Sequence, residues 1–438
     1  MARTRLRRHL RTLVLAELVL LTISAVPSVH AETATAMLSA SEPIVDVGDR
    51  VHLSGSTALP RMREQDELNE TNSSSARGVK VTDAPWMDAI HRTIDGRAVS
   101  VAVGQDDVML YHHAAQTLRT PASNEKLLLA MTMYDTLGAA FRIQTSVAVT
   151  AGETGQVDNL WILGQGDPTV DGSTMERLAH ELVHAGITRV QGRIVGATGY
   201  FGRDWDAPGW DRDARDYVNR PTALTFDGNV DADPEREAAK SLTRRLEDLG
   251  VHVDGTPTSG DPPEGLETIA VERSASLQRL FIKMLRPSDN FMAETLGKRL
   301  GAETGLPGTI AKGAAALQGW TDAHGTQFRL NDNSGLSYGN RVTADGIVRL
   351  LWFAEDQTWG TELRHALPTG GQGTLVNRLH GIDVRAKTGT LDDVSALSGW
   401  VKTGPNEWTE FSILSRGLWK ATASGIEDRI VEILDRRL

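Results

Sequence analysis

The sequence predicts an α/β protein of two or three domains, and three observations carry this prediction. The chain has 438 residues, 40% of them hydrophobic and 24% charged, a balance typical of globular proteins that bury a sizeable core. Short apolar runs typical of strands alternate with longer periodic runs typical of helices. The 42 Gly and 16 Pro residues indicate many turns between these elements.

The first segment has the three-part pattern of a secretory signal peptide. Arginines precede an apolar stretch from Leu13 to Val26, and Val29-His30-Ala31 supplies a small-residue cleavage site. This stretch is shorter than the roughly 20 residues that span a bilayer, so we expect cleavage after Ala31, with an uncleaved anchor as the alternative. Residues 32–79 are rich in Ser, Thr, Glu and Asn and are predicted to form a disordered linker or propeptide.

Folded structure is predicted from about residue 80. Residues 80–142 read as the first part of a domain, with a helix at 86–90, strands at 98–103 and 108–112 around a turn at 104–106, and a helix at 123–137. Residues 143–275 read as an inserted domain, with strands at 145–149, 160–163 and 190–195 and helices at 175–185 and 235–249. Residues 276–438 complete the first domain, with helices at 277–285 and 290–300 and strands at 385–386, 396–401 and 410–414.

Composition excludes several functions. A net charge of -11 and a pI near 5.6 argue against nucleic acid and anionic lipid as partners. The absence of Cys excludes a disulfide, a thiolate zinc site and a cysteine nucleophile.

Three short motifs together point to acyl-transfer chemistry. Ser123-Asn124-Glu125-Lys126 places a hydroxyl and an amine three residues apart at a helix start, on one face and within hydrogen-bond reach. Ser288-Asp289-Asn290 opens another predicted helix, and Lys387-Thr388-Gly389-Thr390 runs into a predicted strand. Each motif alone is explained by helix capping or a strand-edge lysine, but the ordered trio is the signature of class A β-lactamases and penicillin-binding proteins.

The chain resembles the low-molecular-mass, class C penicillin-binding proteins, which are serine-type D-alanyl-D-alanine carboxypeptidases and endopeptidases. The likeness extends over roughly residues 83–435 and includes further segments in the family's order, which are Gly164-Gln165-Gly166-Asp167-Pro168-Thr169, Ala207-Pro208-Gly209-Trp210, Asp332-Asn333-Ser334-Gly335-Leu336-Ser337 and Val394-Ser395-Ala396-Leu397-Ser398-Gly399. The resemblance implies a transpeptidase-like fold, an antiparallel sheet flanked by helices, with the active site between sheet and helices. Larger members carry two extra domains between the first two motifs, whereas only one is expected here.

The chemistry assigns a role to each motif. Ser123 is the candidate nucleophile, and Lys126 is its candidate base, which must be neutral to take the proton. Lys387 is positioned to repel Lys126 and to bind the terminal carboxylate of a D-Ala-D-Ala substrate, helped by Thr388 and Thr390. Gly389 is expected to let the substrate backbone approach the strand.

The other roles follow from the same chemistry and from the resemblance. Ser288 is expected to relay a proton to the leaving amine, and Asn290 to orient Lys126. The resemblance implies an oxyanion hole made by the N–H groups of Ser123 and Thr390. It also implies an Asp of the inserted domain that binds the amine of the peptide's diamino acid, for which Asp204 and Asp206 are the candidates.

Two rival motifs point elsewhere. His180-Glu181-Leu182-Val183-His184 fits the H-E-x-x-H zinc signature, but only Asp204 offers a nearby third ligand, so we interpret both histidines as surface residues and expect no metal. Tyr338-Gly339-Asn340 fits the Y-x-N of class C β-lactamases, yet Ser288-Asp289-Asn290 is the better second motif, and Tyr338 is expected in a turn.

The sequence therefore predicts a cofactor-independent serine D-Ala-D-Ala carboxypeptidase, with possible endopeptidase activity, that acts on peptidoglycan stem peptides outside the cytoplasm. Its expected partners are these peptides and, as covalent inhibitors, β-lactams. The membrane is a partner only if the signal peptide is retained. The alternatives are a β-lactamase or esterase, and a non-catalytic peptidoglycan-binding or β-lactam-sensing protein.

Overall fold

The computed structural model describes residues 84–436, which lie in one compact unit that begins at Val79. The predicted signal peptide, residues 1–31, and the predicted linker, residues 32–79, fall outside the described residues and stay predictions. None of the helices in the described part of the chain is long and apolar enough to cross a membrane.

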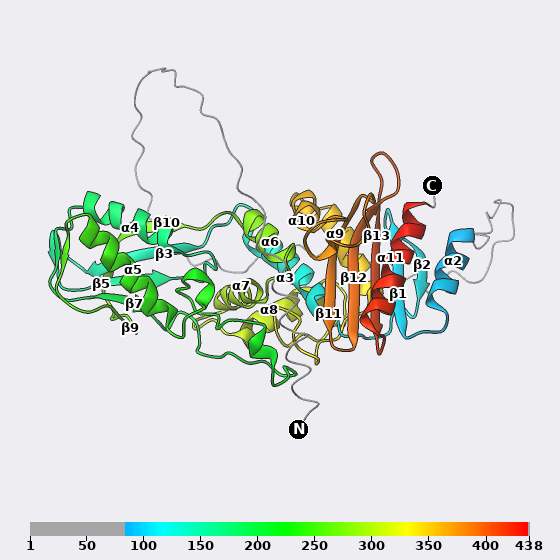
Figure 1. Cartoon of the computed structure of the whole chain (residues 1–438), viewed down its shortest axis with the longest axis horizontal. Coiled ribbons are helices and arrows are strands. Elements are labelled where there is room, and N and C mark those ends of the chain that lie inside the picture. The colour runs from blue at the N-terminus through cyan, green and yellow to red at the C-terminus, as the bar shows by residue number, and fades with distance from the viewer. Residues whose placement is uncertain (1–83, 437–438) are drawn as a thin grey trace, which may run out of the picture. The chain divides into compact units, whose positions relative to one another are not determined.

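The first sheet is antiparallel and has five strands in the order β11-β12-β13-β1-β2 (Figure 1). The N-terminal hairpin joins the three C-terminal strands through β1, where Val99 faces Ser415 of β13. The edge strand β11 carries the third motif, with Lys387 opposite Ser398 of β12. The five strands are β1 (Val99–Gln105), β2 (Val108–His113), β11 (Val384–Leu391), β12 (Val394–Lys402) and β13 (Trp408–Arg416).

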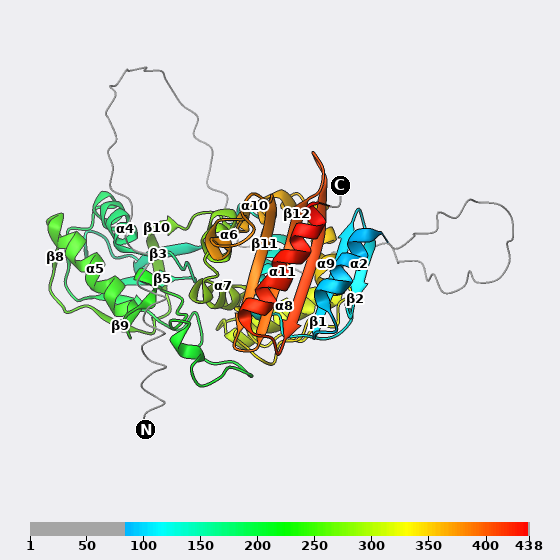
Figure 2. The same ribbon diagram turned by 45° about the vertical axis from the view of Figure 1, so that its right-hand side comes forward.

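Helices cover both faces of this sheet, as expected. On one face, α2 (Pro85–Ile94) and α11 (Lys420–Asp435) pack their apolar residues onto the strands in one buried cluster (Figure 2). A larger cluster holds the helices of the opposite face. These are α3 (Glu125–Leu137), α6 (Leu277–Leu285), α7 (Asn290–Ala302), α8 (Ile310–Ala323), α9 (Ala344–Glu355) and α10 (Gly360–Ala366).

A second sheet is built from strands that lie between Gln144 and Arg273 in the sequence. Its order is β10-β3-β5-β7-β9, with antiparallel pairs at β10–β3 and β3–β5 and parallel pairs beyond. The strands are β3 (Gln144–Thr150), β5 (Leu160–Gly164), β7 (Ile194–Ala197), β9 (Thr258–Gly260) and β10 (Leu266–Arg273). The helices α4 (Gly172–His184) and α5 (Pro234–Asp248) pack on it around a separate hydrophobic cluster.

Three two-residue strands form a small parallel sheet beside the second one. They are β4 (Gln156–Val157), β6 (Arg189–Val190) and β8 (His252–Val253). The predicted strand at 190–195 is wrong, because this segment divides into β6 and β7. Gln191 and Gly192 donate their N–H groups to the carbonyls of Val157 and Asp158, which turns the chain between the two sheets.

The hairpin turn between β1 and β2 also differs from the prediction. Residues 104 and 105 still belong to β1, and the turn is formed by Asp106 and Asp107, both with positive φ. Two consecutive residues of positive φ are typical of the type I′ turn, whose twist suits a two-residue hairpin. The turn was predicted to begin at Gly104, but Asp106 and Asp107 adopt the left-handed conformation that the turn requires.

Candidate active site

Ser123 lies at the start of a helix whose first ten residues are buried. A 3-10 turn, Ala122–Asn124, leads into α3, in which every side chain from Glu125 to Tyr134 is buried. The Nζ atom of Lys126 lies 3.0 Å from the Oγ atom of Ser123. Ala122, directly before the serine, has a φ of 47°, a conformation that a non-glycine residue adopts only where its surroundings enforce it.

Lys126 is buried and held by three oxygen acceptors. Besides Ser123, its amine donates to Oδ1 of Asn290 at 2.7 Å and to the backbone carbonyl of Ser334 at 2.6 Å. Burial lowers the pKa of Lys126 to about 8, against the opposing effect of nearby carboxylates. With this pKa, about a tenth of the amine is neutral at pH 7 and about half at pH 8, so the neutral form that a general base requires is accessible.

Three buried carboxyl groups lie behind Lys126, and motif reasoning assigned a role to none of them. Glu294 accepts hydrogen bonds from the backbone N–H groups of Asn333 and Ser334, at 3.1 and 2.8 Å, and so fixes the segment whose carbonyl holds Lys126. Asn340 donates its side-chain amide to both Asp332 and Glu125. In the sequence, the segment 332–337, one of those that resemble the family, was the feature from which this cluster could have been predicted.

The pKa values of two of these carboxyls are raised. Burial, supported by repulsion from Asp332, raises the pKa of Glu294 to about 7 and that of Glu125 well above its ordinary value. Three ionised carboxylates facing one amine would leave a large uncompensated charge in the interior. The raised pKa values let these glutamates keep their protons to higher pH than usual, which reduces that charge, so the protonation of the cluster and of Lys126 is linked.

The second motif lies at the start of α7, opposite Lys126. Asp289 caps this helix by accepting the N–H of Met292 at 2.8 Å. Ser288, just outside the helix, has a φ of 64°, a second strained position beside the cavity. Asn290 donates its amide NH₂ to the carbonyl of Tyr217 at 3.0 Å while its Oδ1 accepts from Lys126.

Lys387 is also fully buried, and its amine reaches the second motif. It donates to Oγ of Ser288 and to the carbonyl of Thr388, both at 2.8 Å. Burial is the largest cause that lowers the pKa of Lys387 well below its ordinary value, followed by repulsion from Lys126. For Lys126 itself, burial is also the main cause, and the strongest charges acting on it are carboxylates. Burial, rather than repulsion between the two lysines, is therefore the main cause of both lowered pKa values.

Gly389 is required by the protein's own backbone. A Cβ atom at Gly389 would lie 2.6 Å from the carbonyl oxygen of Pro121, so the strand and the nucleophile's turn are in close contact here. Gly335, on the other side of that turn, would place a Cβ atom 1.9 Å from the carbonyl oxygen of Ala122. The strained turn before Ser123 is thus clamped between two glycines, a reason that differs from the expected approach of substrate.

The three motifs meet around one cavity of about 320 Å³. Thr374, Arg378, Lys420 and Ser424 line it without having been predicted. Lys420, from the start of α11, donates to Oγ of Ser395 at 2.8 Å, and Arg378 is paired with Glu427 and Asp428. The predicted residues that line the cavity are Ser123, Ser288, Asn290, Thr388 and Thr390.

A loop of the inserted segment, residues 203–220, closes one side of this site. Trp210 donates its indole N–H to Asp332 at 2.7 Å, and Pro208 accepts the hydroxyl of Ser337 at 2.6 Å. Tyr217 supplies the carbonyl that binds Asn290. We call residues 203–220 the active-site loop.

The two aspartates predicted to bind substrate lie on this loop but do not line the cavity. Asp204 forms an ion pair with Lys298, at 3.0 Å, and accepts the backbone N–H of Ile310 at 2.8 Å. Asp206 is exposed and lies 3.6 Å from Arg215. Asp204 therefore anchors the start of the loop to α7 and α8.

The rival motifs occupy ordinary structural positions. His180 and His184 are exposed on α4, and Glu181 accepts the N–H of Val271 at 3.0 Å. Within residues 84–436, no three His, Cys, Asp or Glu side chains are grouped so that they could hold a metal ion. Tyr338 lies in a turn, as predicted, where its hydroxyl accepts the N–H of Asp392.

The family of the chain follows from comparison with known proteins. A family model described as D-Ala-D-Ala carboxypeptidase 3 (S13) matches residues 88–232 and 230–437. The chain belongs to this family. The D-alanyl-D-alanine carboxypeptidase of Actinomadura sp. (strain R39) is 27% identical over 429 residues, which cover 76% of this chain and 79% of that protein.

Solved structures agree with the fold. Penicillin-binding protein 4 (dacB) from Haemophilus influenzae superposes with a TM-score of 0.69 at 20% identity, over 80% of this chain and 99% of that one. The same protein complexed with a novel β-lactam gives a TM-score of 0.62 at 19% identity, over 80% and 97% of the two chains. The predicted α/β fold and the predicted enzyme class, a serine-type D-Ala-D-Ala carboxypeptidase, are confirmed.

Proposed function

We propose that this enzyme removes the terminal D-alanine from peptidoglycan stem peptides through an acyl-enzyme on Ser123. One observation carries the proposal, which is the buried amine of Lys126, with a pKa of about 8, in hydrogen-bond contact with the Ser123 hydroxyl. A neutral lysine amine at 3.0 Å is within the range at which a general base takes a proton from an attacking hydroxyl.

In the acylation step, Ser123 Oγ forms a bond to the carbonyl carbon of the penultimate D-alanine, and Lys126 takes the hydroxyl proton. The N–H groups of Ser123 and Thr390 are proposed to stabilise the charge on the carbonyl oxygen. The C–N bond then breaks, the proton held by Lys126 passes through Ser288 to the leaving amine of D-alanine, and Lys126 is neutral again. Contact between Lys387 and Ser288 at 2.8 Å supports this relay.

In the deacylation step, a water molecule attacks the ester carbon, and Lys126 takes its proton. The C–O bond to Ser123 breaks, the serine regains a proton, and the shortened peptide leaves as a carboxylate. Attack by the same serine on the bond that cross-links two stem peptides would make the enzyme an endopeptidase as well. Chromatography of digested stem peptides and of a cross-linked dimer measures the two activities side by side.

We propose that Thr388, Thr390 and Lys420 bind the substrate's terminal carboxylate. Both lysines donate hydrogen bonds within the fold, Lys387 to Ser288 and Lys420 to Ser395, but Lys387 is fully buried, whereas Lys420 is exposed and lines the cavity with both threonines. An ammonium with hydroxyls on either side suits a carboxylate. For the amine of the diamino acid, Asp206 is the better of the two candidates, because Asp204 is bound to Lys298.

Penicillin provides the test of the nucleophile. A β-lactam places a strained amide where the D-Ala-D-Ala bond would lie, so mass spectrometry should find one whole penicillin added to Ser123. Ser123→Ala should form no adduct while its circular dichroism spectrum stays that of the wild type. An adduct that persists in Ser123→Ala, or one located on Ser288, would overturn the assignment.

The same experiment separates the alternative functions. An adduct that lasts minutes or longer fits a penicillin-binding carboxypeptidase, and one that turns over within milliseconds fits a β-lactamase. A stable adduct without turnover of a D-Ala-D-Ala peptide would point to a β-lactam-sensing protein instead.

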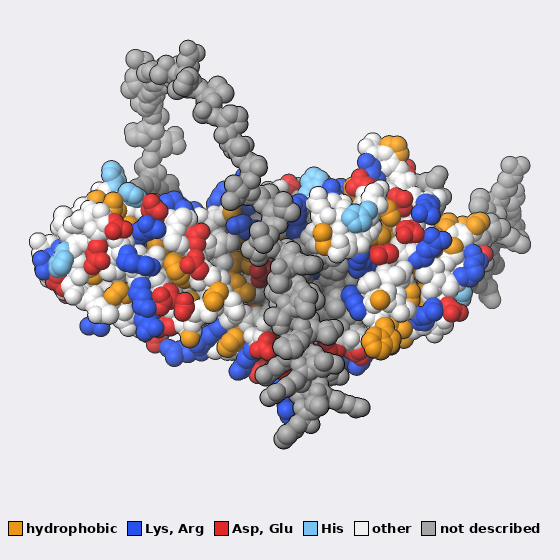
Figure 3. All heavy atoms as spheres, viewed as in Figure 1, with side chains coloured by type: hydrophobic (Ala, Val, Ile, Leu, Met, Phe, Trp, Pro, Cys, Tyr) orange, Lys and Arg blue, Asp and Glu red, His pale blue; other side chains and the backbone are white. Residues whose placement is uncertain are grey.

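We also propose that the enzyme acts outside the cytoplasm, without nucleic acid as a partner. The predicted signal peptide and the location of peptidoglycan support the first statement. The net charge of -11 supports the second. Acidic and basic side chains are interspersed on the face of the described residues shown in Figure 3, where they form no continuous basic surface. Membrane attachment depends on retention of residues 1–31, which N-terminal sequencing of the exported protein determines.

A further inference from the structure

The active-site loop begins and ends beside a second cavity, which the proposed reaction does not use. This cavity has a volume of about 230 Å³. Its walls come from Arg203 at the start of the loop, Arg220 at its end, the first turn of α5 with Glu235, and Ser259 of β9. We call it the loop-base cavity.

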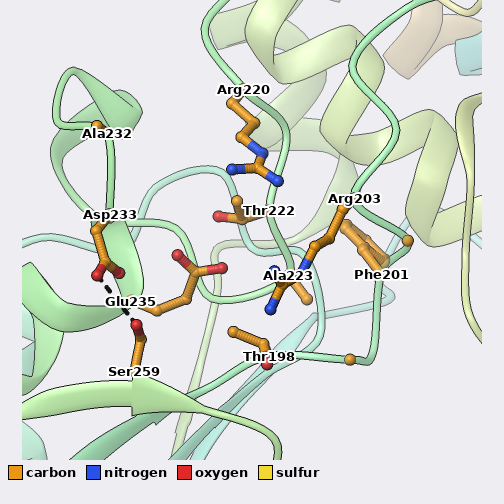
Figure 4. Close-up of a pocket in the computed structure, with 12 residues that line it drawn as sticks. Thr198, Phe201, Arg203, Arg220, Thr222, Ala223, Ala232, Asp233, Glu235 and Ser259 are labelled. Carbon is orange, nitrogen blue, oxygen red and sulfur yellow. Dashed lines mark hydrogen bonds between the residues drawn. The ribbon is translucent and has the colours of Figure 1, made fainter.

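Three charged side chains converge on this cavity. Figure 4 shows Arg203, Arg220 and Glu235 reaching from separate segments toward a common space. Among residues 84–436, none of the three forms an ion pair within 4.0 Å, and neither guanidinium group donates a hydrogen bond. Burial, with a smaller contribution from Asp233, raises the pKa of Glu235. A hydrogen bond from its own backbone N–H opposes that rise, and the positive charges of Arg220 and Arg203 oppose it less strongly.

The neighbouring Asp233 is different, because the fold itself uses its carboxylate. One oxygen accepts the N–H of Arg236 at 3.1 Å and caps α5, and the other accepts the hydroxyl of Ser259 at 3.0 Å. Arg203 is exposed and Arg220 is half-buried, and neither guanidinium has a carboxylate partner within 4.0 Å in the described part of the chain. Glu235 is half-buried and is stabilised by its own backbone N–H. A ligand that displaces water can therefore bind all three groups.

The charges select the kind of ligand. Two guanidinium groups suit a carboxylate, which they bind through parallel N–H···O contacts. A phosphate dianion would satisfy them as well, but it would also face the carboxylate of Glu235. A metal cation would be repelled by both arginines. A molecule with a carboxylate and an ammonium on the same carbon satisfies all three groups.

The size of the cavity limits the ligand further. At roughly 30 Å³ per water, the volume of about 230 Å³ corresponds to about eight water molecules. An α-amino acid as small as alanine fits there with water molecules that bridge it to the walls, and Phe201 offers an apolar surface for a methyl group.

We propose that the loop-base cavity binds a small free α-amino acid, with its carboxylate between Arg203 and Arg220 and its ammonium at Glu235. The further assignment to D-alanine rests on the proposed function, because that reaction releases D-alanine next to the loop. Binding would join the two ends of the segment that holds Asn290 through the carbonyl of Tyr217.

Calorimetric titration of the full-length Ser123→Ala protein with D-alanine tests the proposal. We expect saturable binding that weakens at least tenfold when Arg203→Ala or Arg220→Ala is added. Arg212→Ala is the matched control, since this arginine is exposed on the same loop and does not line the cavity. Its binding should equal that of the parent protein. No saturable binding up to about 20 mM, or equal loss in Arg212→Ala, would overturn the site.

Ligand analogues test the chemistry. N-acetyl-D-alanine lacks the ammonium and should bind at least tenfold more weakly than D-alanine, with no further loss in Glu235→Gln. D-alaninamide lacks the carboxylate and should bind as weakly. If inorganic phosphate binds as tightly as D-alanine, the cavity is a general anion site and the amino-acid proposal is wrong. If L-alanine or a stem peptide binds more tightly than D-alanine, the assignment to the released product is wrong.

Acylation with penicillin separates this inference from the proposed function. Penicillin attached to Ser123 would occupy the cavity that Ser123, Ser288 and Thr390 line, which we call the catalytic cavity and which shares no lining residue with the loop-base cavity. The acylated wild type should therefore bind D-alanine as tightly as the Ser123→Ala protein. Loss of binding on acylation would place the ligand in the catalytic cavity and overturn the inference. If penicillin forms no adduct, the proposed function fails, while the arginine variants still decide whether the amino-acid site exists.

Discussion

The loop-base cavity lies where the active-site loop begins and ends, and the residues between these ends contact the catalytic site. The two sites differ in how their charges are paired. In the catalytic cavity, Lys126 and Lys387 are fully buried, and each is bonded to a named serine. In the loop-base cavity, Arg203, Arg220 and Glu235 face one another without contact. A buried charged group that is hydrogen-bonded within the protein has a fixed position and a shifted pKa before substrate arrives, as catalysis requires. A charged side chain without an ion-pair partner is available to bind a ligand of opposite charge.

The comparison predicts its largest effect at Lys126. Its replacement by alanine removes the proposed base and leaves Ser123 without an acceptor for its proton. Lys126→Ala should slow acylation by penicillin by about 10² or more, the low end of what a general base contributes. The rate at which the mass adduct appears measures this effect.

His184→Ala provides the control for that experiment. This histidine is exposed on α4 and belongs to the rival zinc motif. The variant and a metal chelator should each leave the acylation rate of the wild type within about twofold. Loss of activity with the chelator, restored by zinc and abolished in His184→Ala, would favour a metallopeptidase over the serine mechanism.

The second effect is the dependence of acylation on pH. Lys126 must be neutral to accept the proton, and its pKa is about 8. Below this value the neutral fraction falls about tenfold per pH unit, so the acylation rate should rise with pH and level off above about 8. A stopped-flow pH series with a chromogenic β-lactam checks the midpoint. A rate that is constant from pH 6 to about 9 would contradict the assignment of Lys126 as base.

These two predictions show how far the sequence alone leads. Ser123 and Lys126 are three positions apart on one helix, so local geometry fixes their contact, and the sequence predicts it. Ser288 and Lys387 are 99 positions apart and meet only through the tertiary fold, so their contact was not predicted, although the ordered motifs and the family resemblance placed both residues in one site. The active-site fold is therefore predictable wherever contacts are local or motifs are recognised.

The residues that were missed share a physical cause. Glu294, Asp332 and Lys420 act through contacts between segments that are distant in the sequence. Residue spacing does not predict that Glu294 of α7 contacts the segment of Ser334, or that Lys420 at the start of α11 lines the cavity. Gly389 was predicted as a site residue, but the contact found there is with Pro121, because register and close approach are set by packing. The unpaired charges of the loop-base cavity carried no signal at all.

The third effect concerns the substrate's carboxylate. If Lys420 binds it, Lys420→Ala should lower kcat/KM for a D-Ala-D-Ala peptide by about tenfold, mainly through KM, as expected of a partly exposed charge-assisted contact. A peptide amidated at its terminus should lose a similar factor with the wild type and little more with the variant. Steady-state kinetics of both peptides checks this.

Two further variants sharpen this third prediction. Lys402→Ala, which removes a lysine of β12 that does not line the cavity, should change neither peptide's kinetics. Lys387→Ala should depress kcat, because Lys387 holds Ser288. If the losses caused by Lys420→Ala and by amidation of the peptide add in full, Lys420 does not bind the terminal carboxylate. Lys387 would then be the candidate for that contact.

The smallest effect is a shift of the pH profile in Glu294→Gln. Glu294, with a pKa of about 7, is largely ionised near pH 8, where its charge raises the pKa of Lys126. Glutamine removes that charge, so the midpoint of the acylation profile should move to lower pH, by less than one unit. If the glutamine oxygen keeps the two backbone N–H bonds of Oε1, its NH₂ group replaces Oε2 and cannot accept the bond that Asn333 Nδ2 donates at 3.0 Å, so the plateau rate should also fall.

The matched control for this variant is Glu410→Gln. Glu410 is another buried carboxyl with a pKa raised to about 7, but it belongs to β13 and accepts the indole N–H of Trp352 at 3.0 Å. Its variant should keep the wild-type midpoint even if its stability falls. A purely structural role of Glu294 would lower the plateau and leave the midpoint unchanged. An unshifted or raised midpoint in Glu294→Gln would therefore show that the carboxyl positions the loop without tuning Lys126.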